Sequence, residues 1–401
     1  MKKTIPTYAS KLFVNRTAEI GLVEGYVKQM KGEEVNIPRT VVFQGERGSG
    51  KTWLSLHLKR SVLSELPQVD VLLLGLSLPA EDLREAQTIE DGEWNVAQLS
   101  DDVRNDPDRS CKEIFLWITK QMHFDFRLDS DVEQLGSFVV NNLADHLSHH
   151  YLVLILDSVF EAEWAFLEKF ERYFLAPLAA QSHVLIIMTG RGMLYPWVSP
   201  YLRVRVREER LGPFNNEDSV KQIQLQVPES KVSIDRILQV GGGYPIANIY
   251  LAKRGDDPDA LNEVIDLLLS VIPLHQREKI RQYFEALCVL EGFRDDEIKE
   301  MLGEYLSEGA PKDTTQVRVI RDQLVSTHLV QWKDGRYVID EIVRKVLENY
   351  LMQTSEQDKW ARLHKHANQL YKGWAQKYLR FKEYYDQRAQ YHEVILNSKK
   401  K

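Results

Sequence analysis

The chain has 401 residues, of which 43% are hydrophobic and 28% are charged, and its formal net charge is −7. This length suits two to four domains, and the composition excludes wholesale disorder, collagen-like repeats and disulfide-dense scaffolds. The negative charge argues against a protein whose whole surface binds nucleic acid, although a local basic patch stays open.

Cysteine and the N-terminus indicate the compartment. The only two cysteines, Cys111 and Cys288, lie far apart without a CxxC spacing, which argues against a disulfide framework or a zinc site. The first ten residues carry two lysines but no apolar segment, and the longest apolar run, LVLIL at 152–156, is too short to span a membrane. We therefore expect a cytoplasmic protein with no membrane partner.

The first half alternates strand and helix patterns. A strand is predicted at 40–44, followed by the glycine loop GERGSGKT and a helical segment. Buried strands are predicted at 69–77, 151–157 and 183–190, with helical segments around 113–122 and 138–150 and a polar stretch before 110. Because strands buried on both faces read as continuous apolar runs, the pattern predicts a parallel, doubly wound α/β sheet over about 35–210.

After residue 214 helical patterns dominate, interrupted by GGGYP at 241–245. From about 275, three helices precede two short β-like runs around Asp334 and Gly335, the order of a winged helix. The last segment is helical and carries eleven Lys or Arg against five Asp or Glu after residue 350. We predict domains at 1–210 (nucleotide binding), 211–273 (helical lid), 274–351 (winged helix) and 352–401 (helical segment).

The residues from Gly45 to Thr52 match the phosphate-loop pattern GxxxxGK[ST]. Glycines in such a loop let backbone N–H groups surround phosphate oxygens at the start of a helix. In this role Lys51 contacts the β and γ phosphates and Thr52 ligates Mg²⁺. The candidate nucleotide-binding residues here are Gly45, Gly48, Ser49, Gly50, Lys51, Thr52 and Trp53.

A phosphate loop also needs a carboxylate at the end of a neighbouring strand, and Asp157 fits that place. Many hydrolytic relatives have a second acid directly after it, but here that position is Ser158, whose hydroxyl is a poor base. Glu161 could substitute only if the chain turned suitably. We therefore predict slow hydrolysis, with Lys51, Asp157, Glu161 and Arg191 as the candidate catalytic residues.

Two further assignments stay open on the residues alone. Arg191 follows a buried strand and is a candidate sensor of the γ phosphate, or else a solvated loop arginine. Pro245 either begins a helix that approaches the nucleotide or ends an ordinary turn between helices.

Together these segments resemble the STAND class of P-loop NTPases, and within it the NB-ARC-like branch. LFVNRTAEI at 12–20 is similar to the family's entry motif, and the resemblance implies that Asn15 and Arg16 lie near the adenine. HVLIIMTGRG resembles the family's sensor strand, LGPFNNEDS its entry into the lid, and GGGYPIA the motif whose proline contacts nucleotide in relatives.

The chain departs from the family at two positions. Ser158 replaces the second acid, and Asp340, within YVIDEIVRKVL, stands where relatives have a histidine that contacts the ADP β phosphate. The last helices resemble the opening of the family's helical repeat arms.

The resemblance implies a switch operated by ATP or ADP with Mg²⁺, which hydrolyses ATP slowly and self-associates or binds a protein through its C-terminal helices. The alternative is a DNA-directed AAA+ ATPase, an origin-recognition or transposition regulator that grips DNA with the winged helix. Residues 275–350 weaken it, since they carry twelve basic and fifteen acidic residues. A small-molecule kinase would leave the lid and winged helix unexplained.

Overall fold

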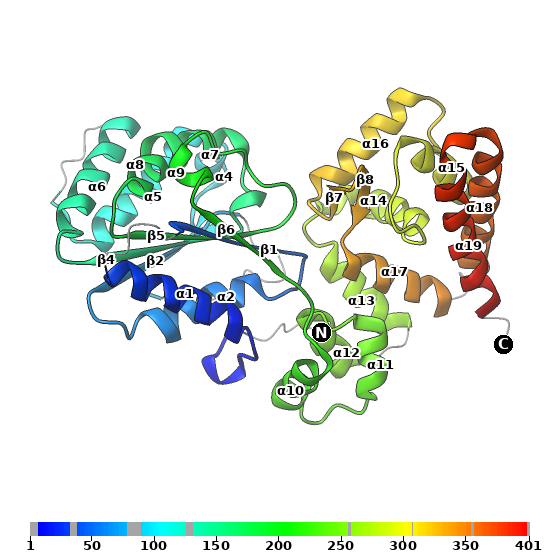
Figure 1. The fold of residues 1–401 in the computed structure, drawn as a ribbon, viewed down its shortest axis with the longest axis horizontal. Coiled ribbons are helices and arrows are strands. Elements are labelled where there is room, and N and C mark those ends of the chain that lie inside the picture. Colours follow the sequence, from blue (N-terminus) through cyan, green and yellow to red (C-terminus); the bar gives the residue numbers. More distant parts are fainter. Residues whose placement is uncertain are drawn as a thin grey trace. The chain divides into compact units, whose positions relative to one another are not determined.

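The computed structural model describes residues 7–32, 38–77, 90–125, 131–255, 258–306, 308–353 and 357–398. It divides into two compact units, Met1–Gly212 and Pro213–Lys401 (Figure 1). In the described ranges, no helix combines the length and the apolar character needed to cross a bilayer.

The first unit is built on a six-stranded parallel sheet. Its strands are β1 (Thr40–Gly45), β2 (Val69–Gly75), β3 (Glu93–Asn95), β4 (Tyr151–Asp157), β5 (Val184–Gly190) and β6 (Val206–Leu211). They are arranged in the order β3-β2-β4-β5-β1-β6, and every pairing is parallel. Since β5 lies between β1 and β4, the ends of these three strands converge on one edge of the sheet.

Helices cover both faces of this sheet (Figure 1). One face packs against α1 (Thr17–Lys31) and α2 (Lys51–His57), which continues as a π-helical turn to Leu63. The other packs against α5 (Pro107–Gln121), α6 (Val132–His146) and α7 (Trp164–Phe170). The short helices α4 (Asp101–Arg104), α8 (Ala176–Ala179) and α9 (Pro200–Arg203) complete the unit.

The predicted parallel α/β sheet is confirmed, but two of its strands were not predicted. β3 and β6 are the edge strands, and β6 has the sequence VREERL with four of its six residues at least partly exposed polar side chains. A strand at the edge of a sheet is covered less completely than a central strand and can carry exposed polar side chains. Its residues therefore do not form the continuous apolar run that marks β1, β4 and β5.

The second unit opens with four lid helices: α10 (Asn216–Gln226), α11 (Ile234–Gly241), α12 (Pro245–Arg254) and α13 (Pro258–Leu268). The glycine cluster between α11 and α12 has left-handed backbone at Gly242 and Gly243, with φ of 62° and 78°. A Cβ at Gly243 would lie 2.4 Å from the carbonyl oxygen of Phe214, so glycine is required there by both conformation and space.

The predicted winged helix follows and is confirmed. Its helices are α14 (Leu274–Leu287), α15 (Asp295–Tyr305) and α16 (Thr314–Ser326), and its wing is the antiparallel pair β7 (Val330–Lys333) and β8 (Arg336–Ile339). Asp334 and Gly335 both have positive φ, as a two-residue hairpin turn requires. Phe293 forms an isolated antiparallel bridge with Tyr337 of β8 through two backbone hydrogen bonds, each of 2.8 Å.

The chain ends in α17 (Glu341–Gln353) and a helical hairpin made of α18 (Gln357–Lys377) and α19 (Lys382–Ser398). Trp360, Leu363, Ala367 and Tyr371 recur at helical spacing on α18 and are almost fully buried. The predicted C-terminal helical segment is therefore confirmed as two packed helices.

Candidate functional site

The phosphate loop connects β1 to α2 at the carboxyl edge of the sheet. Gly48 and Gly50 adopt positive φ of 76° and 92°, which glycine reaches without strain. A Cβ at Gly45 would lie 2.6 Å from Ser49 Oγ and 2.8 Å from the Leu211 carbonyl oxygen. Glycine is therefore required at these motif positions, because the loop needs positive φ at Gly48 and Gly50 and leaves no room for a Cβ at Gly45.

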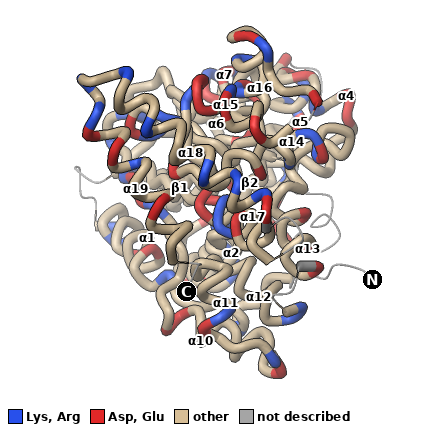
Figure 2. The backbone as a smooth tube through the Cα atoms, turned by 90° about the vertical axis from the view of Figure 1, so that its right-hand side faces the viewer, with Lys and Arg blue, Asp and Glu red and all other residues tan. Residues whose placement is uncertain are grey.

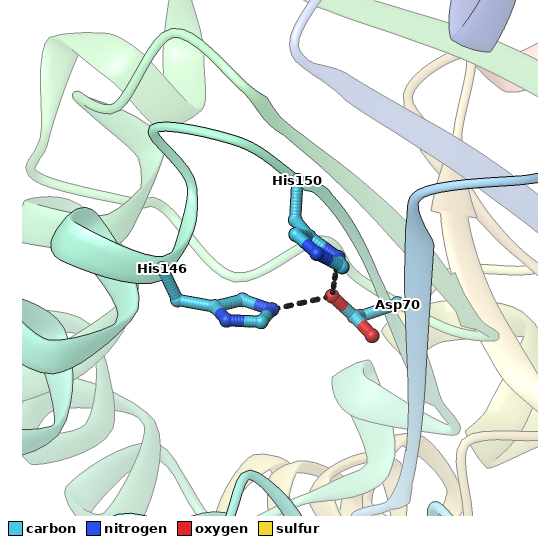
Figure 3. Close-up of side chains that lie close together, drawn as sticks. All are labelled: Asp70, His146 and His150. Atoms are coloured by element: carbon cyan, nitrogen blue, oxygen red, sulfur yellow. Dashed lines mark hydrogen bonds and ion pairs between the residues drawn. The ribbon is translucent and has the colours of Figure 1, made fainter.

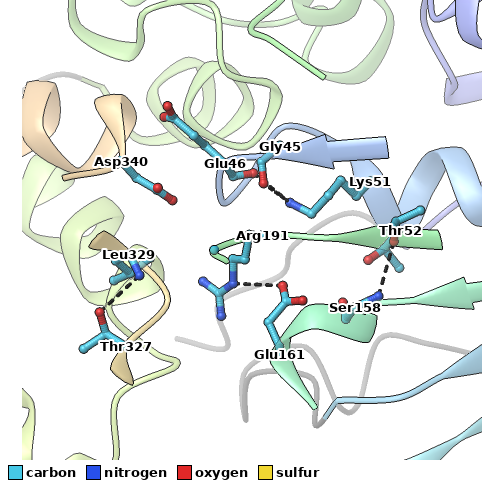
Figure 4. Close-up of polar contacts among 12 residues, drawn as sticks. Gly45, Glu46, Lys51, Thr52, Ser158, Glu161, Arg191, Thr327, Leu329 and Asp340 are labelled. Atoms are coloured by element: carbon cyan, nitrogen blue, oxygen red, sulfur yellow. Dashed lines mark hydrogen bonds and ion pairs between the residues drawn. The ribbon is translucent and has the colours of Figure 1, made fainter. Parts of the chain in front are cut away.

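Lys51 is the first residue of α2, and its side chain is drawn back over the loop. Its Nζ donates hydrogen bonds to the carbonyl oxygens of Gly45 at 2.7 Å and Glu46 at 2.9 Å (Figure 4). The residue is 8% exposed. An ammonium group therefore lies inside the turn whose backbone would surround phosphate oxygens.

Asp157 ends β4 and organises the hydroxyl groups around it. Its carboxylate accepts hydrogen bonds from Thr52 Oγ1 at 2.9 Å, Ser55 Oγ at 3.1 Å and Thr189 Oγ1 at 2.6 Å. The hydroxyl of Thr52 and this carboxylate are hard oxygen ligands of the kind that Mg²⁺ prefers. Their placement fits the predicted magnesium ligands.

Arg191 and Glu161 form a buried ion pair beside Asp157. Arg191 Nε donates to Glu161 Oε1 at 3.0 Å, and both side chains are less than a tenth exposed (Figure 4). Burial raises the pKa of the Glu161 carboxyl, although the charges of Arg191 and Lys51 oppose this shift. Arg191 is thus no solvated loop arginine, and of the two alternatives the structure favours a place in the site.

The ion pair leaves two polar atoms unused. Glu161 Oε2 and Arg191 Nη1 are buried and have no hydrogen-bond partner within the described part of the chain. Buried polar groups are normally satisfied, so this pair of vacant groups fits a site that receives a polar ligand. The residues present are therefore suited to a phosphate group near Arg191 and a water molecule near Glu161.

The turn that brings Glu161 here depends on Ser158. Its φ of 58° is left-handed, and a short 3₁₀ turn, Val159–Glu161, follows. The Ser158 N–H donates to Thr189 Oγ1 at 3.2 Å, which ties this turn to β5. This turn places the Glu161 carboxylate against Arg191, and its role in polarising the attacking water stays a prediction.

The entry motif places its two candidates differently. Arg16 is 8% exposed, and its Nη2 donates to the carbonyl oxygens of Ser49 and Gly212, each at 2.8 Å. Asn15 is exposed, and its Oδ1 accepts from Thr17 Oγ1 at 3.2 Å. Arg16 therefore supports the phosphate loop from behind, whereas Asn15 lies at the start of α1.

Two residues complete the description of this edge. Trp53 follows Thr52 on α2, and its ring meets Tyr8 edge-on at a centroid distance of 5.6 Å. Ser55 was not predicted, although its position four residues after Lys51 puts it on the same helix face and makes it identifiable from spacing alone.

The remaining candidates belong to the second unit. Pro245 is buried at the first position of α12, and its carbonyl oxygen accepts from Gln222 Nε2 at 3.2 Å. Asp340 is 2% exposed, and its Oδ1 accepts from Gln331 Nε2 at 3.3 Å. In the same region, the Leu329 N–H donates to Thr327 Oγ1 at 3.1 Å (Figure 4). Both residues thus have a local structural place, and a nucleotide contact stays a prediction.

Comparison with known proteins gives similarity in structure only. No family model matches the chain, and no curated protein sequence matches it. Among solved structures, Cdc6p from Pyrobaculum aerophilum is 14% identical, with 87% of this chain and 100% of that chain covered at a TM-score of 0.40. The Aeropyrum pernix ORC1 protein in complex with DNA is 14% identical, with 86% and 94% covered at 0.41. AMPPCP-bound DnaA from Aquifex aeolicus is 14% identical, with 80% and 92% covered at 0.34.

The sheet order and the phosphate loop define the fold of the first unit without these likenesses. A parallel sheet with β5 between β1 and β4, and a glycine loop leading from β1 into α2, is the fold of P-loop NTPases.

Proposed function

We propose that the protein is an ATP- or ADP-operated switch of the STAND type that hydrolyses ATP slowly. The observation that carries the proposal is the site next to Asp157. Ser158 occupies the position where a second acid would polarise water, and the nearest substitute, Glu161, is held in a buried ion pair with Arg191. A base engaged in this way favours a long-lived bound nucleotide over rapid turnover.

Lys51, Thr52 and Arg191 are the groups that distinguish ATP from ADP in this proposal. Mg²⁺, when bound by Thr52 and Asp157, supplies positive charge that neutralises the phosphates. Inverting a 1:99 population of two conformations requires ~5.5 kcal/mol of differential binding, and several charged contacts to a γ phosphate are sufficient for that.

In this proposal Arg191 couples binding of the γ phosphate to the state of the Glu161 carboxylate. A γ phosphate near Nη1 attracts the guanidinium, which weakens its attraction for Glu161. The carboxylate is able to accept a proton from water only in the fraction of molecules in which this pair has separated, while Arg191 holds the phosphate, so hydrolysis stays slow. Binding and hydrolysis therefore share one element, the Arg191–Glu161 pair.

A protein partner is more consistent with the second unit than duplex DNA. On α16 the guanidinium of Arg321 lies 3.0 Å from Asp295 and 3.0 Å from Asp322, and on the wing Arg336 lies over the Tyr384 ring at 5.3 Å. Acidic residues predominate along α15, and α17 carries two acidic and two basic residues (Figure 2). Arg321 and Arg336 are thus engaged within the unit, and the remaining basic residues of α16 and the wing, Arg318 and Lys333, are few contacts for the phosphates of DNA.

The C-terminal hairpin supports self-association or a protein partner. Leu379, Phe381 and Val394 are 74%, 54% and 60% exposed. Leu379 and Phe381 lie together in the turn between α18 and α19, and exposed apolar side chains that lie together are typical of surfaces covered by another protein.

The test compares ADP with ATP in two assays. Size and protease sensitivity should differ between the ADP-bound and ATP-bound protein, and single-turnover hydrolysis should be slow. Lys51→Ala should abolish both the difference between the ADP-bound and ATP-bound protein and the hydrolysis. Lys28→Ala, at an exposed position of α1, should retain them. Rapid hydrolysis without a trigger, or identical behaviour with both nucleotides, contradicts the proposal. Salt-sensitive binding to duplex DNA would favour the DNA-directed alternative.

A further inference from the structure

Three side chains that chelate metals in other proteins converge at the amino edge of the sheet. Asp70 is on β2, His146 is the last residue of α6, and His150 directly precedes β4. His146 Nε2 lies 2.7 Å and His150 Nδ1 lies 3.1 Å from Asp70 Oδ2 (Figure 3). In the residues that the structure describes, this is the one group of three or more such side chains with the spacing of metal ligands.

The fold holds these three positions firmly. β2 and β4 pair in parallel, with Asp70 opposite Leu152. His150 precedes Leu152 by two residues, so this register holds His150 close to Asp70. The turn between the histidines is anchored by the buried Leu147, whose carbonyl oxygen accepts from His183 Nδ1 at 2.5 Å. A ligand set held by the sheet register and by a hydrogen-bonded turn is preorganised.

We propose that Asp70, His146 and His150 form a binding site for a divalent transition-metal ion, and that the ion is Zn²⁺. Their ligand atoms all lie within 4.8 Å of one another. Tetrahedral Zn²⁺ with bonds of ~2.0–2.1 Å requires ligand atoms about 3.3 Å apart, so small side-chain rotations close the set. Each neutral imidazole then presents a lone pair and carries its proton on the other ring nitrogen.

The ligand type selects zinc over magnesium. Two imidazole nitrogens and one carboxylate suit Zn²⁺, whereas Mg²⁺ prefers oxygen ligands and retains its water. The three side chains are 30% to 39% exposed, so the fourth position is open to water. A bound ion would fasten the end of α6 to β2 and β4.

This site is separate from the phosphate loop. The loop and Asp157 lie at the carboxyl ends of the parallel strands, whereas Asp70 and His150 lie at the amino ends of β2 and β4. The proposal therefore stands or fails independently of nucleotide binding.

The experiment titrates the metal-stripped full chain, lacking any histidine tag, with ZnCl₂ in excess Mg²⁺ by calorimetry. The wild type should bind one equivalent tightly, and binding should raise its Tm. His146→Ala and the nearly isosteric Asp70→Asn should each weaken binding at least ~10-fold and remove the Tm shift. Lys51→Ala should bind zinc like the wild type.

His149→Ala is the matched control, because His149 is an exposed histidine in the same turn. It should leave the zinc affinity unchanged. Equal weakening by His149→Ala, no measurable isotherm for the wild type, or unchanged affinity in Asp70→Asn would each overturn the proposal. Far-UV circular dichroism confirms that each variant is folded, and Asp70→Asn decides the outcome if His146→Ala does not fold.

Discussion

Acidification is expected to destabilise the C-terminal helices through one buried histidine pair. His364 on α18 and His392 on α19 are 0% and 1% exposed, and their Nδ1 atoms lie 2.8 Å apart. Burial, with a smaller contribution from His364, lowers the pKa of His392 to about 3. At least one of the two rings must remain neutral for this hydrogen bond to form.

Other ionisable groups also face this pair. Glu348 on α17 lies 3.3 Å from His364 Nε2, and Arg344 lies 3.4 Å from Glu348. The rings of Tyr371 and Tyr391 pack against His392 at centroid distances of 5.8 and 5.1 Å. The tyrosines stay neutral in the acid range, so they do not contribute to a pH dependence below 7.

The sign and size follow from proton linkage. The unfolded chain protonates His392 near pH 6.5, whereas the folded chain does so only at about 3. Between these values the unfolded state binds one more proton, so the free energy of unfolding falls by ~1.4 kcal/mol for each unit of falling pH. From pH 6.5 to 5 the loss is about 2 kcal/mol, and above pH 6.5 it vanishes.

Urea unfolding at pH 7.5, 6.0 and 5.0 measures this dependence. His392→Leu removes the titrating ring, so the variant should lose about 2 kcal/mol less than the wild type on acidification to pH 5. His275→Ala, at an exposed position of α14, should retain the wild-type dependence. Equal pH dependence in the wild type and His392→Leu would refute the reasoning.

Three further substitutions test the phosphate-loop unit. Ser158→Asp supplies the missing second carboxylate, and aspartate tolerates the positive φ of this position. Single-turnover assays should therefore show ATP hydrolysis at least ~10-fold faster than in the wild type, and an unchanged rate would contradict the role given to Ser158. Arg16→Ala removes one buried and one partly buried hydrogen bond from a cation to backbone carbonyls, so urea unfolding should show a loss of about 2–4 kcal/mol. A loss below ~0.5 kcal/mol would count against this support. Gly190→Ala places a Cβ 2.4 Å from the Phe160 ring and should destabilise the unit by ~1–3 kcal/mol in the same assay, whereas a neutral effect would show that the ring yields.

The phosphate loop and the central strands are predictable because their signals are local. Gly45 to Thr52 form one motif between a buried strand and a helix. The apolar run of β4 ends at Asp157, and Arg191 directly follows β5. The parallel order of these strands then implies that the polar residues at their ends meet.

The parts that escaped prediction depend on tertiary register. β6 is polar because it lies at the sheet edge, and its sequence alone does not distinguish it from a loop. Asp70 and His150 are eighty residues apart in sequence and meet only because β2 pairs with β4. The spacing of the cysteines indicates no zinc site, and it carries no information about Asp70, His146 and His150, which come together only through this strand pairing.

The most direct test of the central claim is the nucleotide that remains bound after purification. Native mass spectrometry of the intact chain should show the mass of ADP or ATP with Mg²⁺ on the wild type and none on Lys51→Ala. Asp157→Asn should reduce the fraction of chains that carry nucleotide, because a neutral amide replaces the carboxylate that accepts the hydrogen bond from the Thr52 hydroxyl. A wild type that carries no nucleotide and binds neither added ATP nor added ADP would contradict the account.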